Sequence, residues 1–149
     1  MNQRIRIIAV GGLKEGCLIE ASNYYISRLK LKYNISVIEL PDEPAPDNLS
    51  AAGRQAVLVC EGKRVTSRLT SSNITASLAI DGKPANLSFF CGLMEKAAAE
   101  NRCVDFVIGG SLGLADSVLR QSDYRISLSA LTFPHRLARL LLLEVLNNI

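Results

Sequence analysis

Short apolar runs alternate along the chain with longer segments in which apolar residues recur at helical spacing. The short runs predict five strands, over residues 5–10, 35–40, 74–80, 104–108 and 125–128. The longer segments predict helices over residues 15–32, 49–69, 86–101 and 116–121, and a last helix that begins at Pro134 and runs to the end. This alternation predicts an α/β fold, with a mostly parallel sheet and helices on both of its faces.

Three loops follow predicted strands and mark the place to look for a site. They cover residues 78–83, 109–113 and 128–133, and the first of them closes its strand with the turn Asp81-Gly82-Lys83-Pro84. Ligands of parallel sheets bind beyond the carboxyl ends of the strands. We therefore expect these loops to hold any ligand.

Composition narrows the class of protein. The chain has 149 residues, a length that fits one domain over residues 1–149. Its composition, with 48% hydrophobic and 21% charged residues, argues against disorder. A net charge of +3 is too small for a histone-like protein. The chain has a single histidine, His135, which excludes a site built on several histidine ligands, and we expect no metal. The four cysteines form no C-x-x-C pair, and we interpret them as free thiols of a reducing cytosol.

The chain carries no pattern of a secreted or membrane protein. Its N-terminus enters a short strand-like segment without a signal peptide's apolar region. The most apolar stretch, residues 137–146, is interrupted by Arg139 and Glu144 and is shorter than the about 20 residues that span a bilayer. We expect a soluble cytoplasmic protein.

The segment Gly109-Gly110-Ser111-Leu112-Gly113 follows an apolar strand and precedes a helix. Glycines there allow close approach of a ligand to backbone N–H groups, but the spacing fits neither a dinucleotide fingerprint nor a P-loop. A ligand loop and a tight structural turn both remain open.

The segment from Leu128 to His135 is more unusual, because apolar residues with two small hydroxyl residues lead into a proline-initiated helix. Its backbone could read an adenine edge while leucine side chains enclose the ring; the alternative, which these residues alone favour, is an ordinary strand-to-helix loop. At the start of that helix, His135 should have a lowered pKa, because the helix dipole disfavours the imidazolium cation.

Two further features suggest partners. Basic residues cluster in three places, at Arg28, Lys30 and Lys32, at Lys63, Arg64 and Arg68, and at Arg136 and Arg139. Such clusters are usually solvated faces, but three in one small chain modestly favour a polyanionic partner. The last helix is apolar nearly all round, and a homodimer interface is the simpler explanation for such a helix at the end of a small domain.

Several segments form one combined pattern. They are Phe106-Val107-Ile108-Gly109-Gly110-x-x-Gly113-Leu114, Leu128-Ser129-Ala130-Leu131-Thr132-Phe133-Pro134-His135 and Leu137-x-Arg139-x-Leu141-Leu142-Leu143-x-x-Leu146. Ile7-Ile8-Ala9-Val10-Gly11 and Leu78-Ala79-Ile80-Asp81-Gly82-Lys83 agree in place and spacing. Together they resemble the RlmH family, small SPOUT-class methyltransferases of the bacterial large ribosomal subunit, over nearly the whole chain.

The resemblance implies an α/β fold with a C-terminal trefoil knot, a homodimer, and S-adenosylmethionine as methyl donor. It implies methylation at N3 of a pseudouridine in helix 69 of 23S rRNA, in assembled ribosomes. By motif position the donor would contact Leu78, Gly109 and the run Leu128, Ser129, Ala130, Leu131, Thr132 and Phe133. His135 would lie beside the acceptor base, as proton acceptor or as a positioning residue, and the basic residues Arg136 and Arg139 would hold rRNA phosphates.

The chain also departs from the family pattern. Ser111-Leu112 stands where the family usually has Pro-Glu, so a carboxylate of the glycine loop is missing. Ala79 and Asp81 stand where the family pattern has an Asp and a Pro, and Arg136 stands where it has a Pro. Family members continue past the last helix into a His- and Tyr-containing tail, whereas this chain ends at Asn147-Asn148-Ile149. These differences support an alternative, a catalytically weak or inactive ribosome-binding or assembly module on the same fold. A different nucleotide-binding α/β protein is a third hypothesis, based on the glycine loop alone.

Overall fold

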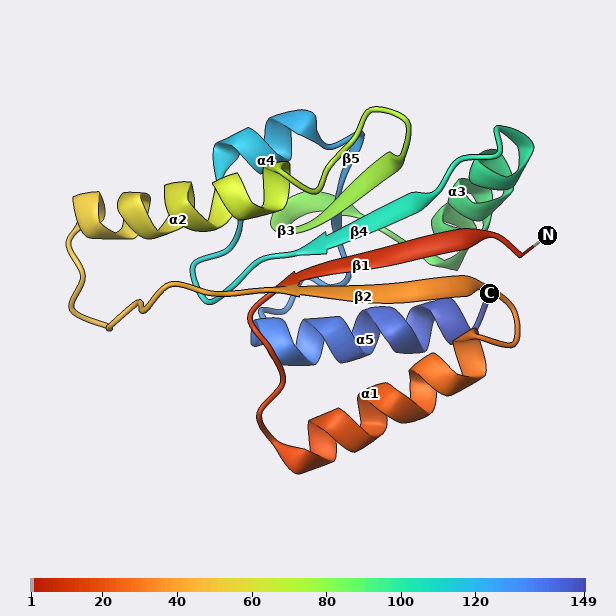
Figure 1. The fold of residues 1–149 in the computed structure, drawn as a ribbon, viewed down its shortest axis with the longest axis horizontal. Coiled ribbons are helices and arrows are strands. Elements are labelled where there is room, and N and C mark those ends of the chain that lie inside the picture. The colour runs from red at the N-terminus through yellow and green to blue at the C-terminus, as the bar shows by residue number, and fades with distance from the viewer. Residues whose placement is uncertain (1) are drawn as a thin grey trace.

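The computed structural model describes residues 2–149 and contains one five-stranded sheet with helices packed on it (Figure 1). Its strands are β1 (Arg4–Val10), β2 (Asn34–Leu40), β3 (Ile74–Pro84), β4 (Val104–Ile108) and β5 (Tyr124–Ser127). The spatial order is β2-β1-β4-β3-β5, and every neighbouring pair is parallel. The predicted α/β fold with a parallel sheet is confirmed.

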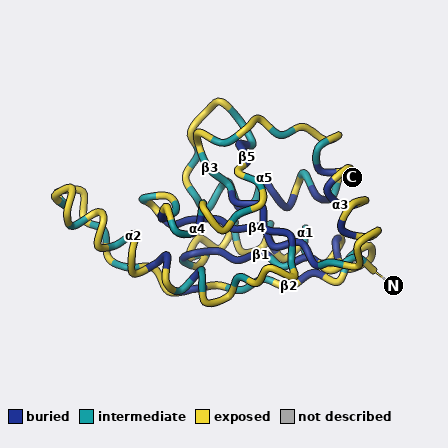
Figure 2. The backbone as a smooth tube through the Cα atoms, turned by 90° about the horizontal axis from the view of Figure 1, so that it is seen from above, coloured by how far each residue is buried: buried dark blue, intermediate teal, exposed yellow. Residues whose placement is uncertain are grey.

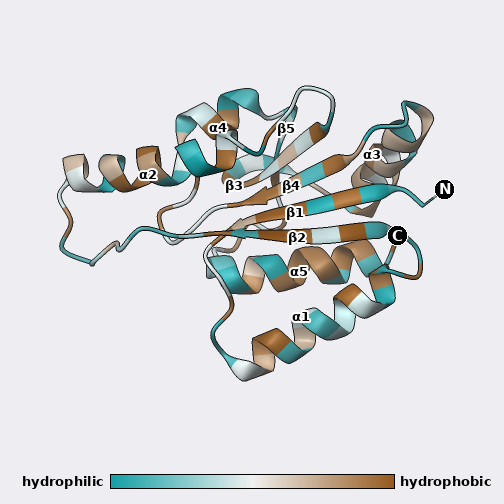
Figure 3. Cartoon of the chain, viewed as in Figure 1, coloured by the Kyte–Doolittle hydropathy of each residue, from teal (hydrophilic) through white to brown (hydrophobic). Residues whose placement is uncertain are grey.

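Helices cover both faces of the sheet, also as predicted. They are α1 (Gly16–Leu29), α2 (Ala51–Thr66), α3 (Leu87–Ala99), α4 (Asp116–Gln121) and α5 (His135–Asn147). Alternation along β1 sends Ile5 and Ile7 into a core shared with α1, α3 and α5, and Ile8 and Val10 into a second core shared with α2 and α4. The apolar colouring of the central strands in Figure 3 follows from this burial on both faces.

Side-chain caps set two of the helix starts. The Ser50 hydroxyl accepts the N–H of Gly53 at 3.1 Å, and the Asn86 side chain accepts the N–H of Phe89 at 2.9 Å. Both helices therefore begin one or two residues later than predicted. Pro134 lies at the N-cap position of α5, one residue before the helix itself.

The third strand differs from the prediction, which ended it at Ile80. β3 continues to Pro84, and both Leu78 and Lys83 pair with Ile126 of β5, so the intervening residues leave the ladder. Gly82 makes this possible, because a Cβ atom there would lie 2.7 Å from the Ile126 carbonyl carbon. The turn signal thus marks a bulge within the strand rather than its end.

The last helix is buried within its own chain. Leu142, Leu143 and Leu146 belong to the sheet core, and α1 packs along α5 (Figure 1). The sheet and α1 cover α5 from two sides, so part of its apolar surface is buried within the chain, and the homodimer stays a prediction. Leu137 and Leu140 remain half-buried.

The N-terminal half of α2 projects beyond the sheet. Figure 2 shows this part of the helix as largely exposed, while Glu61, Gly62 and Val65 in its second half are buried. Residues 57–60 are helical, as predicted. The second half of α2, together with Leu58, therefore packs against the rest of the molecule.

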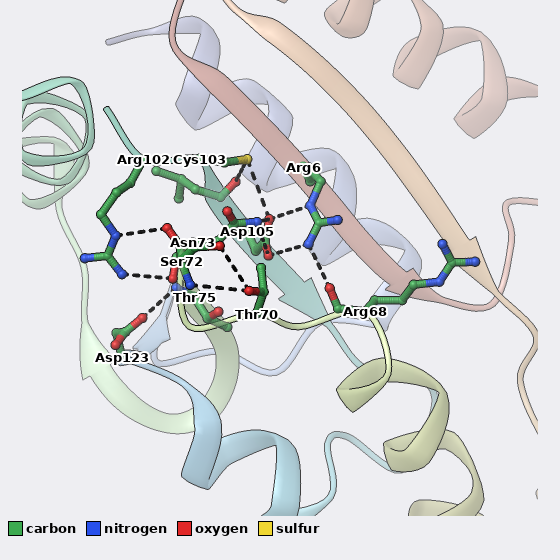
Figure 4. A network of polar contacts seen from close by, with 11 residues as sticks. Arg6, Arg68, Thr70, Ser72, Asn73, Thr75, Arg102, Cys103, Asp105 and Asp123 are labelled. Carbon is green, nitrogen blue, oxygen red and sulfur yellow. Dashed lines mark hydrogen bonds and ion pairs between the residues drawn. The ribbon is translucent and has the colours of Figure 1, made fainter. Parts of the chain in front are cut away.

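A polar network fixes the amino end of the sheet (Figure 4). The carboxylate of Asp105 on β4 accepts hydrogen bonds from Arg6 on β1 and from the Asn73 side chain, and Arg102 donates to backbone carbonyls of residues 71–73. These contacts join β1, β4 and the loop that precedes β3. The network lies at the opposite end from the three predicted ligand loops.

Candidate functional site

Residues 78–80 of β3, where the bulge begins, meet the loops that follow β4 and β5. They enclose a cavity of about 510 Å³, within the range of small-molecule sites. Its lining residues are Leu78, Ala79, Ile80, Ile108, Gly109, Gly110, Ser111, Gly113, Ile126, Ser127, Leu128, Ser129, Leu131, Thr132, Phe133, Pro134, His135 and Ala138. The structure therefore brings these loops into one site, as expected from the parallel sheet.

The cavity wall combines aliphatic side chains with backbone and hydroxyl groups. None of its lining residues carries a carboxylate, and His135 is the one titratable side chain among them, within the part of the chain that the structure describes. Leu131 is 70% exposed although it is large and apolar, which leaves its side chain available to a ligand. Such a wall suits a flat, largely apolar ligand whose polar edge is read by backbone groups.

The glycine loop forms one side of the cavity and folds on itself. Gly113 has a φ of +85° and its N–H donates to the carbonyl of Gly110 at 3.1 Å. A Cβ atom on Gly109 would lie 2.3 Å from the Gly113 carbonyl oxygen, so no larger residue fits without moving the loop. The loop is both a tight turn and a cavity wall, so the two interpretations left open by its sequence coexist.

The loop after β5 is held by its own hydroxyl groups. The Ser127 hydroxyl donates to the Ser129 carbonyl at 2.7 Å, and the Leu131 N–H donates to the Ser129 hydroxyl at 3.0 Å. Most of the residues predicted to contact the methyl donor line the cavity, namely Leu78, Gly109, Leu128, Ser129, Leu131, Thr132 and Phe133. Ala130 is exposed and does not, because the turn points it away from the cavity.

His135 begins α5 and lines the cavity, half-buried. Burial lowers the pKa of its imidazole below the ordinary 6.5, and the charge of Arg136 lowers it further, against the opposing charges of Asp42 and Glu15. The lowered pKa of His135 agrees with the prediction, although desolvation of the imidazole rather than the helix dipole is its leading cause. The imidazole is therefore neutral at pH 7 and able to accept a proton.

The two arginines predicted to hold phosphates have different surroundings. Arg136 is partly exposed and forms an ion pair with Glu15. The Arg139 side chain is 7% exposed, donates to Glu39 at 3.3 Å, and leaves its Nε without a partner among the described residues. The placement of Arg139 does not fit a surface phosphate contact, because its guanidinium points into a narrow gap between α5 and the segment after β1.

Sequence reasoning missed Glu61, whose carboxylate lies behind the glycine loop. The residue is 5% exposed, and a Cβ atom on Gly110 would lie 3.3 Å from its Oε1 atom. Its burial raises the pKa of the carboxyl group above the ordinary 4.5. A signal existed: Glu61 lies four residues from both Val57 and Val65, on the apolar stripe of a predicted helix.

The opposite end of the sheet offers no competing site. A larger open hollow of about 1070 Å³ lies at the amino end of the sheet, lined by Arg4, Lys30, Arg102 and several amides, and it contains no predicted site residue. Lys30 and Arg102 lie near the C-terminal ends of α1 and α3, where their charges offset the helix dipoles. Residues 2–149 contain no group of three or more His, Cys, Asp or Glu side chains arranged to hold a metal, and no helix among them has the length and apolarity to cross a bilayer.

Comparisons with known proteins point to one family. A family model described as predicted SPOUT methyltransferase matches residues 3–147. The chain is 43% identical over 141 residues to ribosomal RNA large subunit methyltransferase H of Listeria welshimeri, covering 94% of this chain and 89% of that protein. It is 41% identical over 142 residues to the protein of the same name from Enterococcus faecalis, with 95% and 89% covered.

Solved structures share the fold at low sequence identity. A probable methyltransferase from Bordetella pertussis superposes with a TM-score of 0.62 at 16% identity, over 98% of this chain and 93% of that one. A putative methyltransferase from Legionella pneumophila, solved in complex with the bound cofactor SAM, gives a TM-score of 0.55 at 12% identity, over 98% of this chain and 66% of that one.

Proposed function

Because the chain belongs to the SPOUT methyltransferase family, we propose that it methylates N3 of a pseudouridine in helix 69 of 23S rRNA, in assembled ribosomes. The general activity, S-adenosylmethionine-dependent methylation of large-subunit rRNA, follows from the family and from the relatives named above. The observation that carries the proposal is the meeting of residues 78–80 of β3 with the loops after β4 and β5 in one cavity.

The residues present fit the donor. The cradle at Gly109 admits no Cβ atom, and Leu78, Leu128 and Leu131 offer apolar surface to an adenine ring. Backbone groups of residues 128–133 are available to read the edge of that ring. When bound, S-adenosylmethionine supplies a methyl group already activated by its sulfonium charge, so alignment is the main task left to the protein.

The acceptor must lose its N3 proton during transfer. His135 is the one imidazole of the chain, lies at the cavity wall and has a lowered pKa, so it is neutral when the acceptor arrives. We assign it the role of proton acceptor for N3, with positioning of the base as the alternative that the pH profile below distinguishes. Arg136, at the same end of α5 and partly exposed, is the candidate for a phosphate contact.

Three further features belong to this proposal. The half-buried leucines of α5 and the family resemblance support a homodimer. A trefoil knot in the C-terminal third, which the family resemblance implies, is also part of this proposal. A ribosomal substrate places the protein in the cytoplasm. Light scattering of the purified protein tests the dimer, with a monomer at working concentration as the contradicting result.

The test of the function is methyl transfer to ribosomes that lack the modification. Ribosomes from a strain without the native enzyme are incubated with the protein and methyl-labelled S-adenosylmethionine. We expect label at one pseudouridine of helix 69, mapped by nuclease digestion and mass spectrometry. Label elsewhere in large-subunit rRNA would disprove the assigned position, whereas ribosome binding without label would favour the non-catalytic module.

A further inference from the structure

The carboxylate of Glu61 is buried and has no part in the methyl transfer proposed above. Its Oε2 atom accepts the backbone N–H of Glu43 at 2.9 Å, and its Oε1 atom has no partner within residues 2–149. A Cβ atom on Gly110 would lie 3.3 Å from Oε1 and 3.4 Å from Oε2. Gly110 lines the cavity and Glu61 does not, so the carboxylate lies behind the wall that Gly110 forms.

Close packing of α2 continues past the glycine loop to the start of α4. Gly62, next to Glu61, approaches Ala115 so closely that an added Cβ atom would lie 2.7 Å from the Cβ atom of Ala115. The position of the carboxylate is therefore fixed by packing. An unpartnered carboxylate oxygen in such a place costs stability, which favours a functional reason for its presence.

The methyl donor offers that reason. S-adenosylmethionine carries a positive sulfonium, whereas none of the residues lining the cavity is acidic in the part of the chain that the structure describes. During transfer the methyl group bonds to N3, the N3 proton leaves to an acceptor, and the sulfur keeps the electron pair of the broken bond. The product, S-adenosylhomocysteine, is a neutral thioether at that atom.

We propose that Glu61 selects the donor by charge, attracting the sulfonium cation across Gly110 and losing this attraction once the methyl group has been transferred. The inference rests on the proposed function, since it takes S-adenosylmethionine as the ligand of the cavity. Charge interactions through a poorly screened protein interior are strong enough to change affinity about tenfold. Glu61 thereby favours binding of donor and release of product.

The charges around Glu61 define how the effect varies with pH. Asp42 and Glu43 face it from the loop after β2, Arg64 faces it from α2 and pairs with Glu43, and the glycine loop contributes backbone alone. Because burial and the two acidic neighbours raise the pKa of Glu61, acid neutralises this carboxylate before ordinary surface carboxylates. The preference for donor over product should fall as the pH falls through that raised pKa.

The test measures binding rather than turnover. Calorimetry compares the wild type, Glu61→Gln and a matched control, Glu95→Gln, which changes an exposed carboxylate on α3. The ligands are S-adenosylmethionine, neutral S-adenosylhomocysteine, and sinefungin, which has an amine-bearing carbon in place of the sulfonium. We expect Glu61→Gln to weaken binding of both cationic ligands about tenfold and of the neutral product less than twofold, and Glu95→Gln to change none of the three.

Equal weakening of all three ligands would overturn the proposal, because it would mean that Glu61 only shapes the loop. Unchanged binding would overturn it as well. Where Glu61→Gln does not fold, the ratio of donor to product affinity in the wild type is measured against pH; a ratio that stays constant through the acid range contradicts the proposal. A wild-type protein that binds none of the ligands refutes the proposed function itself.

Discussion

Arg6 on β1 holds the fully buried carboxylate of Asp105 on β4 by two hydrogen bonds, from Nε at 2.7 Å and from Nη2 at 2.6 Å (Figure 4). The same guanidinium donates to the Arg68 carbonyl at 2.9 Å, and the Asn73 side chain also donates to Asp105. This pair thereby connects the two central strands to the loop that follows α2. It lies at the amino end of the sheet, so it serves the fold and leaves the carboxyl end to the site.

Loss of the Arg6 guanidinium should destabilise the protein more than loss of an exposed arginine. Arg6→Ala leaves the Asp105 carboxylate buried with only Asn73 and the Cys103 thiol as donors, and we expect the free energy of unfolding to fall by about 3 kcal/mol. Arg120→Ala on α4, whose side chain is exposed, should change it by less than about 0.5 kcal/mol. Urea denaturation of both variants checks this, and equal losses would contradict the role of the pair.

Gly109→Ala should abolish donor binding, because the new Cβ atom would meet the Gly113 backbone and force the glycine loop out of place. Gly92→Ala on α3 is the matched control, since its Cβ atom meets nothing within 4 Å and alanine favours a helix by up to about 1 kcal/mol. Calorimetric titration with S-adenosylmethionine compares the two. Undiminished binding by Gly109→Ala would show that the donor does not use this loop.

Leu131→Ala should weaken donor binding about tenfold with little loss of stability. The side chain is 70% exposed in the free protein and becomes covered only when a ligand occupies the cavity. Leu31→Ala, 83% exposed and outside the cavity, removes the same atoms at a place without a ligand. Dissociation constants from calorimetry should separate the two variants, and similar values would exclude Leu131 from the donor site.

The pH profile of methyl transfer should report His135. Its pKa lies below 6.5, so the imidazole is neutral above that pH and its protonation removes the acceptor as the pH falls. We expect the single-turnover rate to fall on the acid side with a midpoint below 6.5, and His135→Asn to abolish that acid limb. A variant that is slower but keeps the same acid limb would assign His135 a positioning role.

The four cysteines should divide into two classes of reactivity. All are free thiols, as predicted, but Cys17, Cys60 and Cys91 are exposed while Cys103 is buried. Burial raises the pKa of the Cys103 thiol to about 11, so its thiolate is scarce near neutral pH. Titration of the native protein with a thiol reagent should count three fast groups, with the fourth appearing on unfolding; four fast groups would contradict the burial of Cys103.

The order of elements could be predicted from sequence because each strand and helix has its own periodicity. Turn chemistry was harder to interpret: Asp81-Gly82 is typical of a strand end, yet here the chain leaves the ladder and returns beside Ile126. Whether it returns depends on the backbone of β5, which is distant in sequence. The elements that cover α5 within the chain could not be predicted for a similar reason, because periodicity shows how apolar a helix is but not which element covers it.

Most of the candidate site could be predicted, because loops after parallel strands meet at one edge of the sheet. What could not be predicted concerns charges. Arg139 belongs to a basic cluster in sequence but is buried against Glu39, and Glu61 lies behind Gly110 although they are far apart along the chain. Partners of charged groups are set by tertiary packing, which a single sequence does not encode in any local pattern.

The proposed function requires that the cavity at residues 78–80, 109–113 and 128–135 holds S-adenosylmethionine. The decisive measurement is calorimetric titration of the wild-type protein with S-adenosylmethionine, with ATP as a control for nonspecific nucleotide binding. We predict saturable binding of S-adenosylmethionine at one site per chain and none of ATP. Absence of S-adenosylmethionine binding, or equal binding of both nucleotides, would contradict the assignment of the cavity as a methyl-donor site.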